Sequence, residues 1–492
     1  MKLSKLILPL LLCLGCLLAC GKKEPAATTV PEASKSLQVT EVTEEEPDIP
    51  LTADYGGADF RILTAGNIAY EDFTVDETAS MPLDIAQYKR KMRVEESYKV
   101  KISETKQSGY SSGGGPGFLE ISRAVSAGEC NYDLALVAGY DVSALAYAGM
   151  LYDLKSMPGI DLTKSWWDQK ANESLTLCDV LFFTTGDITC SDNDAAFTIM
   201  FNKKLLADYN LDSPYDMVYS GEWTLENFKS LCKAVTEDLN NDDVMDENDR
   251  YGLLVWVDSN IGMVHAAGQR CCVANGDALE LTLYNESTVR VIEQYLSFAL
   301  DRRHALQYQS IRSGADFEYE LWSGDHGLFW TTYMGIVPKF RASESDFGLL
   351  PYPKANAAQE SYYSTVAPYN SQFICVPLIQ DDAERTGVLT EALAYYGQKI
   401  VLPAYYDVSL KGVHARDEES ADMLDIIFDN LVFDAGFIYQ VGPYNKYLNM
   451  MISNGDTNFA SVYDSRLQIA TEQLKQINSY YAAAAAQWKT EN

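Results

Sequence analysis

The chain has 492 residues, enough for two to four domains at roughly 150 residues each. A hydrophobic fraction of 47% and an aromatic fraction of 12% exclude a chain that is disordered throughout. Thirty-eight Lys and Arg against 70 Asp and Glu give a net charge of −32, which repels phosphate backbones and anionic lipids. The charge therefore argues against nucleic-acid partners and polybasic membrane docking.

The first twenty residues have the pattern of a secretory signal. Two lysines precede an apolar stretch over residues 6–18, which is short for a membrane-spanning helix and is interrupted by Pro9. Its end, Leu-Leu-Ala-Cys, resembles a bacterial lipobox, in which the Cys is lipidated and becomes the first residue. That resemblance implies a signal peptide over residues 1–19 and a lipid anchor on Cys20. An ordinary secretory signal with a chance Cys is the alternative.

Residues 20–54 are rich in Ala, Thr, Ser, Pro and Glu and have almost no periodic apolar pattern. We expect a flexible acidic tether with a root-mean-square span of roughly 30 Å. The globular body should then begin near Tyr55. Seven cysteines remain in that body, an odd number without CxxC spacing, so we expect buried free thiols instead of a disulfide framework.

Short apolar runs alternate with amphipathic segments along the body, which predicts an α/β fold. A predicted strand over 58–65 precedes a predicted helix over 83–98 and a second extended run over 100–102. The run 133–139 is continuously apolar, as in a strand buried on both faces of a parallel sheet. Further strands are predicted at 182–183, 197–201, 328–330, 347–350 and 373–376. Further helices are predicted after an N-cap at Thr224 and over 289–300, 383–400, 420–432 and 463–485.

One acidic segment, residues 238–249, has EF-hand-like calcium spacing. Oxygen-bearing side chains stand at loop positions 1, 3, 5, 9 and 12, and position 7 offers a backbone carbonyl. The predicted ligands are Asp238, Asn240, Asp242, Val244, Asp246 and Asp249. Position 6 is Asp243 instead of Gly, and position 12 is Asp instead of Glu, although dockerin-type loops, which the segment also resembles, use Asp there. We expect a structural Ca²⁺, with a solvated acidic loop as the alternative.

Several segments occur in the order seen in extracellular solute-binding proteins of ABC importers. They are YDLALVAGYDVSALAYAGMLYDL (132–154), SWWDQKANESLTL (165–177), FNKKLLADYNL (201–211), GEWTLENFKSLCKAV (221–235) and the region 327–354. The chain is similar to the carbohydrate-binding group that includes maltose-binding protein. It is closest to lipoprotein members from clostridia, in which residues 403–430 have a near counterpart. The resemblance covers about residues 57 to 480.

This resemblance implies an α/β fold of two lobes, a periplasmic-binding-protein-like clamp with strands crossing between them. By analogy, lobe 1 takes residues 55–187 and 328–374, and lobe 2 takes 188–327 and 375–492. It also implies a monomer, lipid-anchored on the extracellular face of the cell membrane, that captures a sugar or oligosaccharide and delivers it to ABC permease subunits without catalysis. A surface sensor or adhesin on the same scaffold, or a carbohydrate-active enzyme, are the alternatives.

Sugar sites combine aromatic faces with carboxylates and amides that bind hydroxyl groups. Trp330 stands where the family has a sugar-stacking Trp, with a core position as the alternative. Tyr140 and Asp141 follow the strand that ends at Gly139, and ligands bind at such carboxyl ends in open α/β sheets. The other predicted ligand-binding residues are Asn67, Asp187, Asp192, Asn193, Asp194 and Tyr369. Trp166, Trp167 and Trp223 are expected to pack in the cores.

Overall fold

The computed structural model of the protein describes residues 45–68, 72–312, 314–340, 343–406 and 417–491. The predicted signal peptide, Cys20 and most of the predicted tether lie outside the described residues. Within these ranges, no helix combines the length and the hydropathy that crossing a membrane requires.

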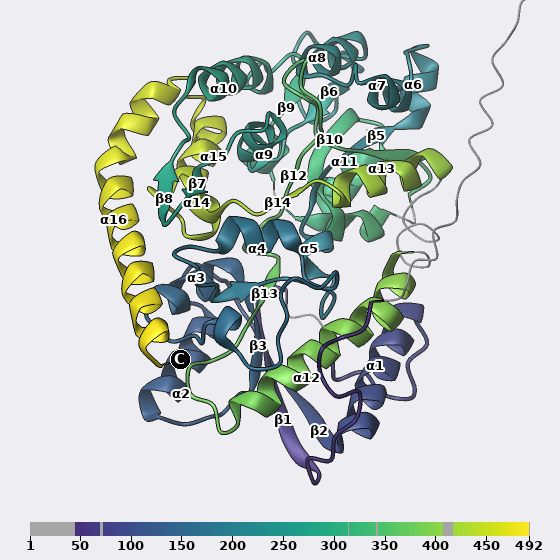
Figure 1. Cartoon of the computed structure of the whole chain (residues 1–492). Helices are drawn as coiled ribbons and strands as arrows, with labels where there is room; N and C mark the ends of the chain where they lie inside the picture. The colour runs from purple at the N-terminus through teal and green to yellow at the C-terminus, as the bar shows by residue number, and fades with distance from the viewer. Residues whose placement is uncertain (1–44, 69–71, 313, 341–342, 407–416, 492) are drawn as a thin grey trace, which may run out of the picture. The chain divides into compact units, whose positions relative to one another are not determined.

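Two mixed sheets of five strands each organise the described chain (Figure 1). The first has the order β2-β1-β3-β13-β4, in which β1 is parallel to β2 and β3 while β13 is antiparallel to β3 and β4. Its strands are β1 (Ala58–Gly66), β2 (Val100–Ser108), β3 (Leu134–Ala138), β4 (Phe183–Thr184) and β13 (Gln372–Cys375). The helices of this part are α1 (Pro82–Tyr98), α2 (Pro116–Ala127), α3 (Gly139–Tyr147), α4 (Gln169–Leu175) and α12 (Ala383–Tyr396).

Alternation along the strands of the first sheet supplies two buried faces. Phe60 and Ile62 of β1 share one apolar cluster with Leu393 of α12, whereas Leu63 and Ala65 of the same strand belong to the other cluster. Successive side chains of a strand point to opposite faces, so a strand covered on both sides is apolar throughout. Helices therefore cover both faces of β1.

The second sheet has the order β11-β5-β10-β6-β9, with β6 parallel to β10 and β9 and β5 antiparallel to β10 and β11. Its strands are β5 (Phe197–Asn202), β6 (Tyr251–Leu254), β9 (Ala305–Leu306), β10 (Gly327–Tyr333) and β11 (Phe347–Leu350). The helices between α4 and α12 are α5 (Ser191–Asp194), α6 (Lys203–Asp208), α7 (Pro214–Ser220), α8 (Leu225–Ala234), α9 (Ser259–Ala266), α10 (Glu286–Ala299) and α11 (Ala315–Ser323).

Smaller elements complete the described chain. A hairpin joins β7 (Cys272–Asn275) to β8 (Ala278–Leu281), and β12 (Ser364–Thr365) pairs with β14 (Leu431–Val432). The last helices are α13 (Glu418–Phe428), α14 (Ala435–Ile438), α15 (Tyr444–Asn454) and α16 (Phe459–Glu491). The predicted helix over 420–432 thus ends at Phe428, and β14 follows it.

The predicted lobe boundaries need correction. The expected first lobe included residues 328–374, but β10 and β11 belong to the second sheet and only β13 belongs to the first. Likewise α12, expected in the second lobe, packs against α1 of the first. The reason is that a strand's sheet is decided by long-range pairing partners, which the local pattern of the strand does not contain.

The chain crosses between the two sheets at residues 185–196 and again at residues 366–371. These two segments lie against each other, since the Ala367 amide donates to the Ala195 carbonyl at 3.0 Å and Ala196 forms a bridge with Val366. These paired segments connect the part of the chain around the first sheet, lobe 1, with the part around the second sheet, lobe 2, and we call them the hinge segments.

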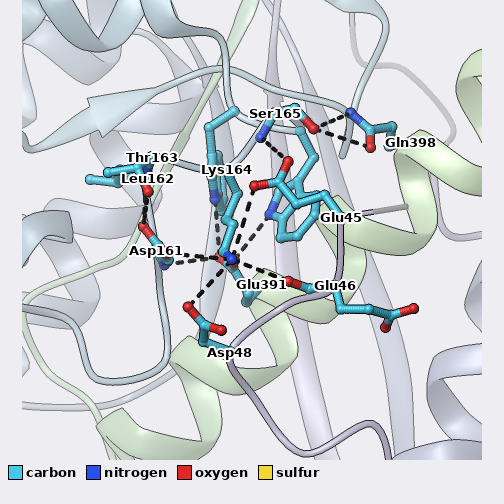
Figure 2. A network of polar contacts seen from close by, with 12 residues as sticks. Glu45, Glu46, Asp48, Asp161, Leu162, Thr163, Lys164, Ser165, Glu391 and Gln398 are labelled. Atoms are coloured by element: carbon cyan, nitrogen blue, oxygen red, sulfur yellow. Dashed lines mark hydrogen bonds and ion pairs between the residues drawn. The ribbon is translucent and has the colours of Figure 1, made fainter. Parts of the chain in front are cut away.

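The first described residues are fastened to the first lobe (Figure 2). Lys164 forms an ion pair with Asp48 at 3.3 Å and donates to the Glu46 carbonyl at 3.1 Å, while the Ser165 amide donates to the Glu45 carboxylate at 3.1 Å. The end of the predicted tether, residues 45–48, is therefore bound to the first lobe through Lys164 and Ser165.

Candidate functional site

The carboxyl ends of the central strands carry an aromatic and polar cluster between the two sheets. β3 leads directly into Tyr140 of α3, β6 leads into Trp256 and Asp258, and β10 ends at Tyr333. Because ligands bind outside the carboxyl ends of strands in open α/β sheets, these positions form the candidate site. We call the set the junction cluster: Tyr140, Trp256, Asp258, Tyr333, Tyr369, Asn445 and Asn449.

Hydrogen bonds tie the cluster together across the crossing segment. The half-buried Asp258 carboxylate accepts from the Tyr369 hydroxyl and from the Asn449 side-chain amide. Asn445 of α15 donates its amide to the Tyr140 hydroxyl at 2.8 Å, and the Tyr140 and Tyr369 rings have centroids 6.0 Å apart. The first lobe, the hinge and the second lobe thus all contribute polar groups to one place.

Two further rings extend the aromatic surface on the second lobe. The centroids of Trp256 and Tyr333 lie 5.6 Å apart in a tilted arrangement, and Trp256 also packs on Phe197 at 4.7 Å. Tyr333 is half-buried, so part of its ring reaches solvent. Trp256 is only 8% exposed, so Tyr333 is the ring of this pair that the apolar C–H side of a ligand can reach.

The electrostatics of the cluster follow from burial and from one carboxylate. Burial raises the pKa of the Asp258 carboxyl, and hydrogen bonds from Tyr369 and Asn449 oppose that shift. Burial and the neighbouring Asp258 charge together raise the pKa of the Tyr369 and Tyr140 hydroxyls well above their usual value. Both tyrosines are therefore neutral donors at physiological pH.

Two predicted residues reach the junction cluster. Tyr140 and Tyr369 belong to the junction cluster, and Asn67 follows β1, where its side chain accepts from the Ser111 amide at 2.8 Å. Asp141 has a different role, because its Oδ1 accepts from the Gly113 and Gly115 amides at 3.0 and 2.9 Å. A Cβ at Gly115 would meet Asp141 Oδ2 at 2.6 Å, so this glycine permits the close approach.

Asp187, Asp192 and Asn193 line a cavity of about 140 Å³ beside Trp166 and Trp167. Burial and the neighbouring Asp192 raise the pKa of the Asp187 carboxyl well above its usual range. Burial and Asp168 raise the pKa of Asp192 to about 7. No residue of the junction cluster lines this cavity, so these three predicted ligand residues lie apart from the cluster. Asp194 accepts from the Tyr405 hydroxyl at 2.7 Å.

Trp330 is a core residue, so the prediction that it offers a stacking face is wrong. Only 1% of its surface is exposed, and its ring packs edge-on against Phe340 at 4.8 Å. Its indole N–H donates to the Tyr308 hydroxyl at 3.3 Å. The interior of β10 is buried on both faces, whereas the strand's last residue, Tyr333, is half-buried and packs beside Trp256.

In the acidic loop over 238–249, side-chain carboxylates accept hydrogen bonds from backbone amides of the same loop. Asp238 accepts from the amides of loop positions 4 and 6, Asn241 and Asp243, at 2.7 and 2.9 Å. Asp243 has φ 62°, the left-handed turn for which EF-hand loops use Gly at position 6. The carboxylate and amide oxygens of this loop are ligands that suit a hard cation. Calcium binding here stays a prediction.

Two constellations resemble catalytic machinery without forming it. Thr365, His265 and Asp434 are linked by contacts of 2.9 Å in the order of a hydrolase triad, but all three are fully buried. Asp434 also accepts backbone amides at the start of α14, so the trio fastens α9 to the paired strands β12 and β14. Residues 109–113 match the spacing GxSxG, yet the Ser111 hydroxyl is buried without a partner, so no base activates it.

His265, Asp434 and Cys271 also bring three metal-ligand atoms within 4.8 Å of one another, and no other His, Cys, Asp or Glu trio in the described ranges does so. The Asp434 oxygen is already shared by His265 and the Cys271 amide. None of the seven cysteines in the described ranges forms a disulfide, and six of the seven are buried.

Trp256, Asp258, Tyr333, Asn445 and Asn449 were not among the predicted site residues. Trp256 and Asp258 follow an apolar strand in the same way as Tyr140 follows β3, so the rule that identified Tyr140 applies to them as well. The two asparagines come from a helix almost 200 residues later, and the sequence holds no local signal for their approach.

Three solved structures with the same fold were obtained with carbohydrate ligands or are named for the sugar they bind. A cyclic alpha-maltosyl-1,6-maltose binding protein from Arthrobacter globiformis aligns with a TM-score of 0.56 at 13% identity, covering 87% of this chain and 100% of that one. An ABC substrate-binding protein from Listeria monocytogenes in complex with cycloalternan gives 0.54 at 13%, covering 85% and 99%. The GacH receptor of Streptomyces glaucescens, solved with acarbose, gives 0.52 at 12%, covering 85% and 99%.

No family model matches the sequence, and no curated protein matches it either. At these identities the structural likeness establishes the fold: a two-lobed α/β fold with mixed sheets, as in periplasmic solute-binding proteins. The predicted fold class is confirmed.

Proposed function

We propose that this protein is the substrate-binding lipoprotein of an ABC importer and captures a sugar or oligosaccharide between its two lobes. The observation that carries the proposal is the junction cluster, where aromatic rings and hydrogen-bonding side chains from both lobes and the hinge meet at the carboxyl ends of the strands. The solved structures that share the fold support the carbohydrate class, since one was solved with cycloalternan and another is a cyclic alpha-maltosyl-1,6-maltose binding protein.

The mechanism is lobe closure without chemistry. A ligand that touches both Tyr140 and Trp256 stabilises the closed arrangement by its differential affinity, with the paired crossings near Ala196 and Val366 as the hinge. A permease in the membrane then recognises the closed form. Lipidation of Cys20 would keep the protein on the extracellular face of the cell membrane, within reach of that permease.

A thermal-shift screen of the purified protein tests this proposal. The panel holds gluco-, malto-, manno-, xylo- and chito-oligosaccharides together with amino acids, dipeptides and inorganic anions. Binding to the native state raises the melting temperature by mass action, so at least one carbohydrate should raise it by several degrees at millimolar concentration. Tyr369→Phe, which removes only one hydroxyl, should reduce that shift. A panel in which only peptides or anions raise the melting temperature would overturn the carbohydrate assignment.

A further inference from the structure

The Asp258 carboxylate has no cationic partner. It stands between the end of β6 and the start of α9, and its side chain does not cap that helix. Its two partners, the Tyr369 hydroxyl and the Asn449 amide, are neutral, and among the described residues no Lys, Arg or His charge acts on it. A half-buried carboxylate in this state retains acceptor capacity and negative charge.

The neighbouring amides add acceptors to the same place. An ionised carboxylate only accepts, so the Asn449 side chain must present its NH₂ group to Asp258 and direct its Oδ1 away. That Oδ1 is buried and has no hydrogen-bond partner, and neither has the Oδ1 of Asn445. The two asparagines stand four residues apart on α15, which places them on one face of the helix. A buried acceptor without a donor destabilises the structure until a ligand supplies one.

Aromatic rings surround these acceptors. Tyr140 and Tyr369 lie on one side, and Tyr333 with Trp256 continues the surface on the second lobe. The faces of such rings carry negative charge density and attract cations, and they also stack on sugar rings. The Asp258 carboxylate and the electron-rich ring faces would repel an anion, so the cluster disfavours anionic ligands.

We infer that the ligand of the junction cluster is a carbohydrate that bears a positively charged amino group, which Asp258 and the Asn449 oxygen receive. The inference rests on the proposed function, because it takes the carbohydrate class from there and adds the ammonium group. An ammonium group offers donors only, which matches a site that offers acceptors only, and its charge pairs with the carboxylate. A neutral sugar would satisfy the acceptors through hydroxyl groups but would leave the charge of Asp258 unpaired.

Calorimetric titration of the purified protein with matched sugars tests the inference. The β-1,4-linked trimers of glucosamine, N-acetylglucosamine and glucose share a backbone and differ at the second carbon of each ring. The monosaccharide pairs glucosamine with glucose, galactosamine with galactose and mannosamine with mannose extend the comparison to other ring geometries. We expect at least one amino sugar to bind ten times or more tightly than its neutral counterpart and its N-acetylated form.

Two variants locate the effect. Asp258→Asn keeps the size of the side chain and removes its charge, so it should abolish the preference for the amino sugar. Asp187→Asn is the same substitution at a carboxyl in the cavity beside Trp166 and should leave the preference intact. If neutral sugars bind and no amino sugar binds more tightly than its partner, or if the preference survives in Asp258→Asn, the inference is wrong and the proposed function stands. If no carbohydrate of this set or of the thermal-shift panel binds, both fail.

Discussion

Trp330 and Tyr333 stand three residues apart on β10 and meet different surroundings. The first is 1% exposed and enclosed by Trp322, Phe340 and Tyr308, whereas the second is half-buried beside Trp256. The difference follows from position, since the interior of the strand is covered on both faces and only its end reaches the carboxyl edge of the sheet.

Substitution of these two residues should separate stability from binding. Trp330→Ala should lower the free energy of unfolding by about 3–5 kcal/mol and leave the sugar affinity of the folded protein unchanged. Tyr333→Ala should instead weaken binding by about 2 kcal/mol, roughly thirtyfold, with a smaller loss of stability. Denaturant unfolding and calorimetry on both variants measure the two effects. Unaltered affinity in Tyr333→Ala, or a large loss of affinity in Trp330→Ala, would reverse this assignment.

Glu391 is a buried carboxyl that holds two indoles. Its two oxygens accept from the Trp166 and Trp167 indole N–H groups at 3.0 Å each, next to the network of Lys164 shown in Figure 2. Burial raises its pKa from 4.5 to about 7, although the indole hydrogen bonds oppose the shift. Burial raises the pKa of Asp72 to about 6 in the same direction.

A raised pKa in the folded state means that the folded chain holds a proton that the unfolded chain has released. The stabilisation is complete below about pH 4.5 and is lost as the pH rises through about 7. We therefore expect the protein to be more stable near pH 5 than near pH 8, with up to about 3 kcal/mol from Glu391 alone. Urea unfolding across this range measures the slope, and Glu391→Gln should flatten it. A wild-type stability that rises from pH 5 to pH 8 would contradict the assignment.

The positions of individual residues in the fold were predictable where the local sequence pattern determines them. Tyr140 and Asn67 follow strands that are visible in the sequence as apolar runs, and Thr224 caps α8 as its position before a helical segment predicts. Asn445 and Trp330 were not predictable in this way, because burial and approach depend on segments distant in the chain.

At the level of elements, periodicity located helices such as α1, α10 and α12 and strands such as β1, β3 and β5, but predicted no helix at α2, α9 or α15. The predicted strand over 58–65 and helix over 83–98 match β1 and α1 to within one residue at each end. The assignment of β10 and β11 to a sheet failed, since each short apolar run could pair with strands of either sheet. Between the predicted strands at 182–183 and 197–201, where no helix was predicted, the structure contains the short helix α5.

Calcium binding by the acidic loop over 238–249 can be tested through the melting temperature. If it binds Ca²⁺, chelation with EDTA should lower the melting temperature by several degrees, because the ion binds only the folded loop. Asp238→Ala combined with Asp242→Ala should abolish the EDTA sensitivity. Asp212→Asn, an exposed acid outside the loop, serves as the control. A wild-type melting temperature that EDTA leaves unchanged would show a solvated acidic loop instead.

For the whole molecule, the predicted anchor decides where the protein works. Cys20→Ser removes the thiol that the lipobox-like sequence presents, so the variant should leave the membrane fraction and appear in the medium. Fractionation of cells followed by detection with an antibody measures the change. Retention of Cys20→Ser in a detergent-soluble membrane fraction would mean that another segment holds the protein there.

We propose that a carbohydrate binds between the two lobes, at the junction cluster. A crystal structure of the protein grown with the carbohydrate that gives the largest thermal shift tests it most directly. We predict sugar rings against Tyr140, Trp256 and Tyr333, with a donor group of the sugar on the Asp258 carboxylate. A sugar bound instead in the cavity of Asp187 and Asp192, or only at the outer surface of one lobe, would contradict the account.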